Sequence, residues 1–306
     1  MIAYLIKRIA SLIPVALGVA TLTFALIHLV PGDPVIAMLG DSAAPADIEG
    51  LRHQLGLDRP LGAQYLTFLA DLAHGDLGQS ISARVPVAAL IRERFPATLE
   101  LSGAGLLVAI LIAFPLGMIA GAKPGGAADV GAMGFAIIGI SIPHLYLGPL
   151  LMIVFSLHLG WLPLTGRGGL SHLILPAITL GTALAAVLAR MLRQSLIQIR
   201  NADYMRTALS KGLSPMKALV GHGLRNALTP VVTILGLQAG ALLTGSIITE
   251  MLFSWPGLGR LMITAIGQRD YPLVEGCVLT FALTYVLVNM LTDVVYGLID
   301  PRIRLA

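Results

Sequence analysis

The residue types that most often carry out chemistry are few in this sequence, and they are scattered. The chain has one cysteine, Cys277, and seven histidines, at positions 28, 53, 74, 144, 158, 172 and 222. A zinc site or a disulfide framework needs these residues in clusters. The sequence also has no G-x-x-x-x-G-K-[ST], G-x-S-x-G or H-E-x-x-H motif. We therefore expect no metal site, no catalytic residues and no enzymatic activity in this chain.

A few polar residues lie within apolar stretches, and a charged group at membrane depth is costly. Glu250 lies in one such stretch, and Asn289 and Asp293 lie one helical turn apart in another. A proton or ion path would favour several acids near the middle of the membrane, and only Asp293 comes close to it. We interpret these side chains as bonds between helices or as groups that snorkel to the membrane interface. Gly236 and Gly240 have the spacing typical of a close helix crossing.

Composition indicates an integral membrane protein. Of the 306 residues, 56% are hydrophobic and 12% are charged, against about 45–50% and 25% in soluble domains. The mean hydropathy is +0.86. The net charge of +4 is distributed unevenly around apolar segments, so membrane topology explains it better than a nucleic-acid partner does.

Six continuous apolar stretches are long enough to be transmembrane helices, which need about 20 residues each. They cover residues 9–30, 98–121, 130–157, 173–193, 229–253 and 276–299. Continuous runs favour helices over barrel strands, whose apolar residues alternate. The first run is longer than the apolar core of a cleaved signal peptide, about 7–15 residues, so we expect it to be retained. The predicted fold class is an all-α membrane protein with six transmembrane helices.

The distribution of basic residues predicts the orientation. An even number of spans places both termini on one side, and lysine-rich and arginine-rich loops stay in the cytoplasm. Every lysine falls on the side of the N-terminus, and the loop between Arg190 and Arg225 is strongly basic. Both termini are therefore predicted to be cytoplasmic.

The segment 31–97 is too long for a simple connection. Its apolar residues recur at helical spacing between Leu61 and Leu72, and several prolines divide it. We expect a helical extracytoplasmic cap inserted after the first span. The alternative is a solvated loop.

The segment 194–228 is the second long connection. Asp203 can cap a helix that ends at Gly212, and Ser214 can cap a second helix with Pro215 at its first position. A rigid, basic helix–turn–helix suits docking onto another protein. The alternative is a basic patch lying on anionic lipid headgroups.

This segment resembles the EAA loop of permease subunits of binding-protein-dependent ABC importers. The resemblance is strongest to the dipeptide, oligopeptide, glutathione and nickel group, and it extends along the whole chain. The matching stretches are Arg206-Thr-Ala-Leu-Ser-Lys-Gly212, His222-Gly-Leu-Arg-Asn-Ala-Leu-Thr-Pro230, Pro31-Gly-Asp-Pro34, Leu55-Gly-Leu-Asp-Arg-Pro-Leu61, Gly75-Asp-Leu-Gly78, Trp255-Pro-Gly-Leu-Gly-Arg260, Arg269-Asp-Tyr-Pro272 and Asp300-Pro-Arg302. One departure is that Arg206 occupies the position of the usual Glu, and His222-Gly-Leu-Arg225 replaces Ile-x-Leu-Pro. This departure weakens the inference for any single side chain but leaves the helix–Gly–helix shape intact.

The resemblance implies that residues 1–306 form one type I importer permease domain in the bacterial cytoplasmic (inner) membrane. The implied partners are a homologous second permease, two ATP-binding subunits that hold ATP and Mg, and an extracytoplasmic solute-binding protein. This chain would need no cofactor of its own. Residues 194–228 would be the coupling loop that docks on an ATPase. The residues expected at that contact are Tyr204, Arg206, Thr207, Ala208, Lys211, Gly212, Ser214 and Pro215.

The implied solutes are short peptides, including glutathione-like ones, for which this chain would form half of the translocation path. Nickel or a metal chelate is the alternative, since importers of both kinds share these motifs. A secondary transporter driven by an ion gradient is a further, less favoured class. No substrate-binding residue can be assigned from the sequence.

Overall fold

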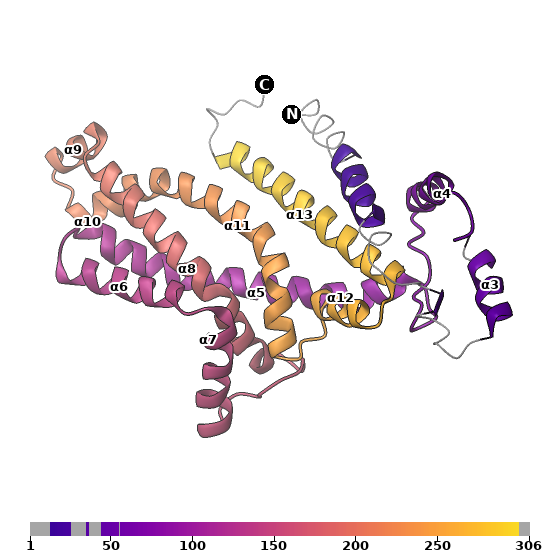
Figure 1. Cartoon of the computed structure of the whole chain (residues 1–306). Coiled ribbons are helices and arrows are strands. Elements are labelled where there is room, and N and C mark those ends of the chain that lie inside the picture. Colours follow the sequence, from indigo (N-terminus) through magenta and orange to yellow (C-terminus); the bar gives the residue numbers. More distant parts are fainter. Residues whose placement is uncertain (1–12, 26–34, 37–43, 55, 300–306) are drawn as a thin grey trace. The chain divides into compact units, whose positions relative to one another are not determined.

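The structure is a computed structural model that describes residues 13–25, 35–36, 44–54 and 56–299, and these residues are mostly helical (Figure 1). Within these ranges, β pairing is limited to an isolated antiparallel bridge between Gln79 and Pro86. The helices are Ile13–Ala25, α3 (Pro45–Gln54), α4 (Leu61–Ala73), α5 (Val87–Ala122), α6 (Ala127–Ser141), α7 (His144–Leu151), the π-helix η1 (Met152–His158), α8 (Leu170–Arg200), α9 (Asp203–Ser210), α10 (Pro215–Ala218), the π-helix η2 (Leu219–Gly223), α11 (Leu224–Leu252), α12 (Leu258–Gly267) and α13 (Tyr271–Ile299).

The predicted all-α membrane fold is confirmed. Four of the six predicted spans coincide with helices that are long and apolar enough to cross a membrane. These helices are α5, α8, α11 and α13. The first predicted span, 9–30, is described only over residues 13–25, and the rest of it lies outside the described residues. The predicted insertion after this span contains α3 and α4, so its helical character is also confirmed.

The third predicted span, 130–157, is broken rather than continuous. Its two parts, α6 and α7–η1, are bent by 100° at the junction between them. Ile142 has an extended backbone there (φ −90°, ψ 112°) and Pro143 follows it. A proline disfavours the helical conformation in the residue before it, so α6 ends at Ser141 and a new helix begins in another direction.

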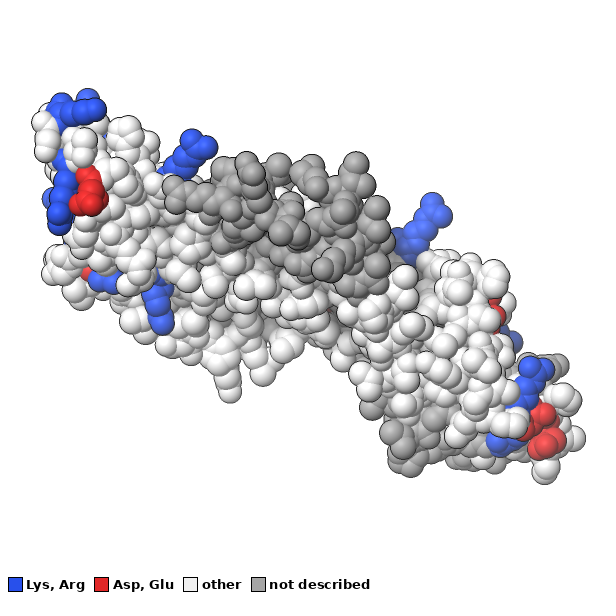
Figure 2. Space-filling view, turned by 90° about the horizontal axis from the view of Figure 1, so that it is seen from above, with Lys and Arg blue, Asp and Glu red and all other residues white. Residues whose placement is uncertain are grey.

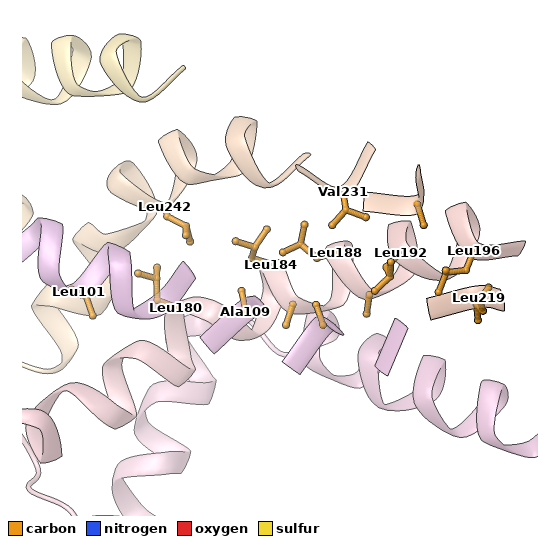
Figure 3. Packing of buried hydrophobic residues seen from close by; sticks show 14 of the residues in the cluster. Leu101, Ala109, Leu180, Leu184, Leu188, Leu192, Leu196, Leu219, Val231 and Leu242 are labelled. Atoms are coloured by element: carbon orange, nitrogen blue, oxygen red, sulfur yellow. The ribbon is translucent and has the colours of Figure 1, made fainter. Parts of the chain in front are cut away.

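The chain forms two compact units. Unit 1 comprises residues 1–96 and 257–284, and unit 2 comprises residues 97–256 and 285–306. The main hydrophobic cluster belongs to unit 2, where leucines of α8 follow one another along the helix between α5 and α11 (Figure 3). Helix α8 is the most enclosed of these four helices. In its most apolar stretch 61% is buried, compared with 28–33% in the corresponding stretches of α5, α11 and α13. Helix α8 is therefore the helix around which unit 2 is packed.

Glycines on α5 allow α8 to approach closely. A Cβ atom at Gly117 would lie 2.8 Å from the Cβ of Leu192 and 3.0 Å from the carbonyl oxygen of Ala189. A Cβ atom at Gly121 would lie 2.7 Å from the Cβ of Leu196. These separations are shorter than real Cβ contacts, so only glycine fits at either position.

Replacing Gly117 by valine should therefore destabilise unit 2. Overpacking of this kind costs about 2 kcal/mol, and we expect a lower thermal unfolding midpoint for the protein in detergent or nanodiscs. The matched control is Gly103→Val on the same helix, where an added Cβ meets no atom within 4 Å. Equal midpoints for the two variants would contradict the close α5–α8 contact.

In unit 1, the carboxylate of Asp270 holds the turn before α13 against the loop that precedes α5. Its Oδ2 accepts hydrogen bonds from the Ser80 hydroxyl (2.5 Å), the Ser82 hydroxyl (2.8 Å) and the Ser82 backbone N–H (3.0 Å). Its Oδ1 accepts one from the backbone N–H of Leu273 (3.3 Å). Burial by itself raises the pKa of Asp270, but these hydrogen bonds outweigh burial, and the pKa lies below the usual aspartate value.

This lowered pKa predicts a contribution to stability that depends on pH. The contribution is present above the pKa of the unfolded chain and disappears as the pH falls through the lowered pKa of the folded protein. We expect Asp270→Asn to cost about 2 kcal/mol at neutral pH and to flatten the acid side of the stability profile, measured as unfolding midpoint against pH. Asp71→Asn, which changes an exposed carboxylate on α4, should keep the wild-type profile. The same profile for Asp270→Asn and wild type would contradict this role.

Candidate functional site: a helix–turn–helix elbow

The candidate site is the segment 201–223, which we call the elbow; it contains α9, the turn 211–214, α10 and η2. The elbow follows α8 directly, because only Asn201 and Ala202 separate Arg200 from the first residue of α9. The guanidinium of Arg200 donates to the carbonyl oxygen of Ala122 at the end of α5 (3.2 Å). The entry to the elbow is thus attached to two spans of unit 2.

The start of α9 differs from the prediction by one residue. The N-cap is Ala202, and Asp203 is the first residue of the helix rather than its cap. An acid in the first turn still interacts favourably with the positive end of the helix dipole. Asp203 also lies 3.6 Å from Arg206, but both side chains are largely exposed, so this ion pair adds little.

The end of α9 has the geometry of a Schellman motif. The backbone N–H of Gly212 donates to the carbonyl of Leu209 (2.9 Å), and that of Leu213 donates to the carbonyl of Ala208 (3.3 Å). Gly212 itself has φ +85°, a left-handed conformation that side chains disfavour. The prediction that a glycine ends this helix is confirmed, and the backbone explains why a glycine is needed.

The second helix of the elbow is short. Ser214 is the N-cap residue and Pro215 is the first helical residue, as predicted, although the Ser214 side chain makes no capping hydrogen bond. After four residues α10 continues as the π-helix η2, which leads into α11. The elbow is therefore continuous with a long span at both ends.

The inner face of the elbow is fixed to the rest of unit 2. Met205 and Ala208 of α9 are buried together with Ala218 and Leu219 in the main hydrophobic cluster. The side-chain amide of Asn226 on α11 donates to the Tyr204 hydroxyl (3.1 Å). Apolar packing below and a hydrogen bond at the side make the elbow a rigid element rather than a loose loop.

The outer face carries most of the predicted contact residues. Seven of the eight are exposed: Tyr204, Arg206, Thr207, Lys211, Gly212, Ser214 and Pro215. Ala208 differs, because only 7% of its surface is exposed and it belongs to the hydrophobic cluster. We therefore assign Ala208 to packing beneath the surface. Figure 2 shows Lys and Arg side chains gathered at the end of unit 2 where Figure 1 places α9 and α10.

Among the polar residues of the spans, Glu250 bonds between helices, as interpreted. Its buried Oε1 accepts hydrogen bonds from the hydroxyls of Thr98 on α5 (2.7 Å) and Ser246 (3.2 Å). The Oδ1 of Asn289 has no hydrogen-bond partner in the part of the chain that the structure describes. The side chain of Asp293 lies outside the described residues. No group of three His, Cys, Asp or Glu residues that could hold a metal occurs among the described residues.

The predicted close crossing at Gly236 and Gly240 is confirmed. A Cβ atom at Gly240 would lie 2.7 Å from the Tyr285 ring, and one at Gly236 would overlap the Thr292 side chain. These contacts pack α11 against α13 within unit 2.

Sequence reasoning missed the ion pair between Asp129 at the start of α6 and Arg193 on α8. A signal for it existed, since Asp129 is the single acidic residue between Glu100 and Asp203. An isolated acid at the end of an apolar segment needs a partner. The sequence did not indicate which basic residue provides it.

Comparisons with known proteins cover nearly the whole chain. Residues 113–305 match the family described as "binding-protein-dependent transport system inner membrane component", and residues 1–102 match the family of its N-terminal part. The chain is 40% identical over 336 aligned positions to the dipeptide transport system permease protein of Escherichia coli (strain K12). It is 44% identical over 304 positions to the glutathione transport system permease protein of Salmonella choleraesuis (strain SC-B67). Both alignments cover 99% of this chain and 99% of the relative.

Among solved structures, the fold is similar to a chain of the MetNI methionine ABC transporter in an inward-facing conformation. The TM-score is 0.56 at 17% identity, and the match covers 70% of this chain and 97% of the other. At this identity the similarity concerns the fold alone.

The left-handed backbone at Gly212 leads to a local prediction. A β-branched residue there should loosen the turn by about 1–2 kcal/mol, so amides of residues 204–213 in Gly212→Val should exchange with deuterium several-fold faster than in wild type. Gly221→Val on η2 is the matched control, because a Cβ at Gly221 meets no atom within 4 Å and its φ is not left-handed. Unchanged exchange in Gly212→Val would contradict a strained backbone at this position.

Proposed function

Because the chain belongs to the family of inner membrane components of binding-protein-dependent transport systems, we propose that it forms half of the path by which an ATP-driven importer carries short peptides across the membrane. Two of the relatives described above, which match over nearly their full lengths, are named for dipeptide and glutathione transport. These names favour a peptide solute over nickel or a metal chelate.

The elbow is the structural observation that carries the coupling part of this proposal. Its inner face is packed into unit 2, whereas seven polar, basic or small residues remain exposed on its outer face. A helix anchored in this way moves as one body when a partner pushes on its free face. We propose that the exposed residues contact an ATP-binding subunit and that α8 and α11 carry the movement into the membrane.

The remaining assignments follow from this role. ATP and Mg would be held by two ATP-binding subunits, and this chain would contribute neither catalytic groups nor a cofactor. A homologous second permease would complete the path, and an extracytoplasmic binding protein would deliver the solute. The termini and the elbow would face the cytoplasm, and the insertion 31–97 would face the opposite side.

The permease function predicts an uncoupled variant. In vesicles that contain all subunits, ATP should drive accumulation of a radiolabelled dipeptide. Gly212→Val should keep ATP hydrolysis while dipeptide uptake falls by about tenfold or more, because a weakened turn transmits less of the movement. The measurement is dipeptide uptake and phosphate release from the same vesicles.

Two controls make this test specific. Gly221→Val, in the same segment, should leave uptake and hydrolysis unchanged. The permease alone should accumulate nothing, and accumulation driven by an ion gradient without the ATP-binding subunits would favour a secondary transporter instead. Normal ATP-dependent uptake by Gly212→Val would contradict the coupling role of the elbow.

A further inference from the structure

The ion pair between Asp129 and Arg193 has a geometry that the Glu100–Arg167 pair of unit 2 lacks. The Nε of Arg193 donates to Oδ1 of Asp129 (2.6 Å) and its Nη2 donates to Oδ2 (2.7 Å), so both carboxylate oxygens are engaged by one planar guanidinium. In the other pair, two nitrogens of Arg167 share one oxygen of Glu100. A bidentate ion pair of this kind restricts the relative orientation of the two side chains as well as the distance between them.

This pair is also more enclosed. The exposed fractions of the side chains are 4% for Asp129 and 27% for Arg193, against 36% for Glu100 and 40% for Arg167. Solvent and salt weaken exposed pairs strongly and enclosed pairs much less. Asp129 and Arg193 therefore form a persistent link between α6 and α8.

The carboxylate of Asp129 has a further partner that extends the link to α5. Its Oδ2 accepts a hydrogen bond from the backbone N–H of Gly125 (2.8 Å), in the turn that joins α5 to α6. Gly125 has φ +78° there. One carboxylate thus fixes the shape of this turn and attaches it to α8.

The position of the pair relates it to the elbow. Arg193 lies two helical turns before α8 ends at Arg200, and the elbow follows. The other end of α6 lies at the bend before Pro143, where α7 begins. Gly148 of α7 packs against Leu252 and Phe253 at the C-terminal end of α11. A shift of α6 along its axis would therefore reach the opposite side of unit 2.

We propose that the Asp129–Arg193 pair is a positioning contact that passes movement of the elbow from α8 to α6. The inference rests on the function proposed above, since it assumes that a partner moves the elbow. The hydrophobic effect between α6 and α8 has no preferred direction. The bidentate ion pair opposes movement of α6 along α8, so α6 must follow α8 when α8 moves.

The test uses the complete importer in vesicles and measures radiolabelled dipeptide imported per ATP hydrolysed. Arg193→Lys keeps the positive charge but loses the planar guanidinium that binds both carboxylate oxygens. We expect about a tenfold lower ratio of dipeptide imported to ATP hydrolysed, which is in the range of mutations that alter coupling. Assembly of the importer and its rate of ATP hydrolysis should be unchanged. Asp129→Asn should lower the ratio similarly. The double variant should lower it no further than either single change, because the two residues act as one unit.

Matched controls come from the Glu100–Arg167 pair of unit 2. Arg167→Lys and Glu100→Gln should both leave the ratio at the wild-type value. An unchanged ratio in Arg193→Lys, with ATP-driven uptake by the wild type, would overturn the positioning role and leave the proposed function standing. Failure of Arg193→Lys to assemble would show a purely structural role and would also overturn it. No ATP-driven uptake by the wild-type importer would overturn the proposed function and this inference together.

Discussion

The close contact between α5 and α8 is the constraint on which the rest of unit 2 depends. Lipid tails are as apolar as leucine, so burying apolar surface between helices does not drive their association in a membrane, and close atomic packing must do so. Gly117 and Gly121 remove the side chains that would hold Leu192 and Leu196 away. With α5 in place on one side, α8 has α6, α7 and α11 around it and becomes the most buried span.

A well-held α8 gives the elbow its mechanical character. The elbow follows α8 directly, buries Met205 and Ala208 in the same hydrophobic cluster and continues through η2 into α11. Its rigidity comes from these attachments, because a helix of eight residues is not stable by itself in water. Gly212 then provides the sharp reversal that leaves the basic outer face free.

Much of this arrangement could be predicted from the sequence, because its signals are local. Runs of about 20 apolar residues indicate spans regardless of their neighbours, and Gly212 with Ser214 and Pro215 indicates a helix end and a new start. The burial of Ala208 could not be predicted, since alanine suits either face of a short helix.

Contacts between distant segments were also beyond sequence reasoning. Asp129 and Arg193 are 64 residues apart, and Asp270 is 190 residues from Ser80. Nothing in a single sequence pairs such positions. Similarly, hydropathy shows that residues 130–157 are apolar, and Pro143 favours a kink. Neither signal gives the direction or the size of the bend of 100°.

That bend has a consequence for the surrounding lipid. With 15 residues, α6 is about 22 Å long at 1.5 Å per residue, which is shorter than the hydrocarbon core of about 30 Å. Helix α11, with 29 residues, is about 44 Å long and exceeds it. A bilayer can accommodate a short helix by becoming locally thinner, whereas α11 can match the same bilayer by tilting. A broken span therefore places a different demand on the surrounding lipid than a continuous helix such as α11 does.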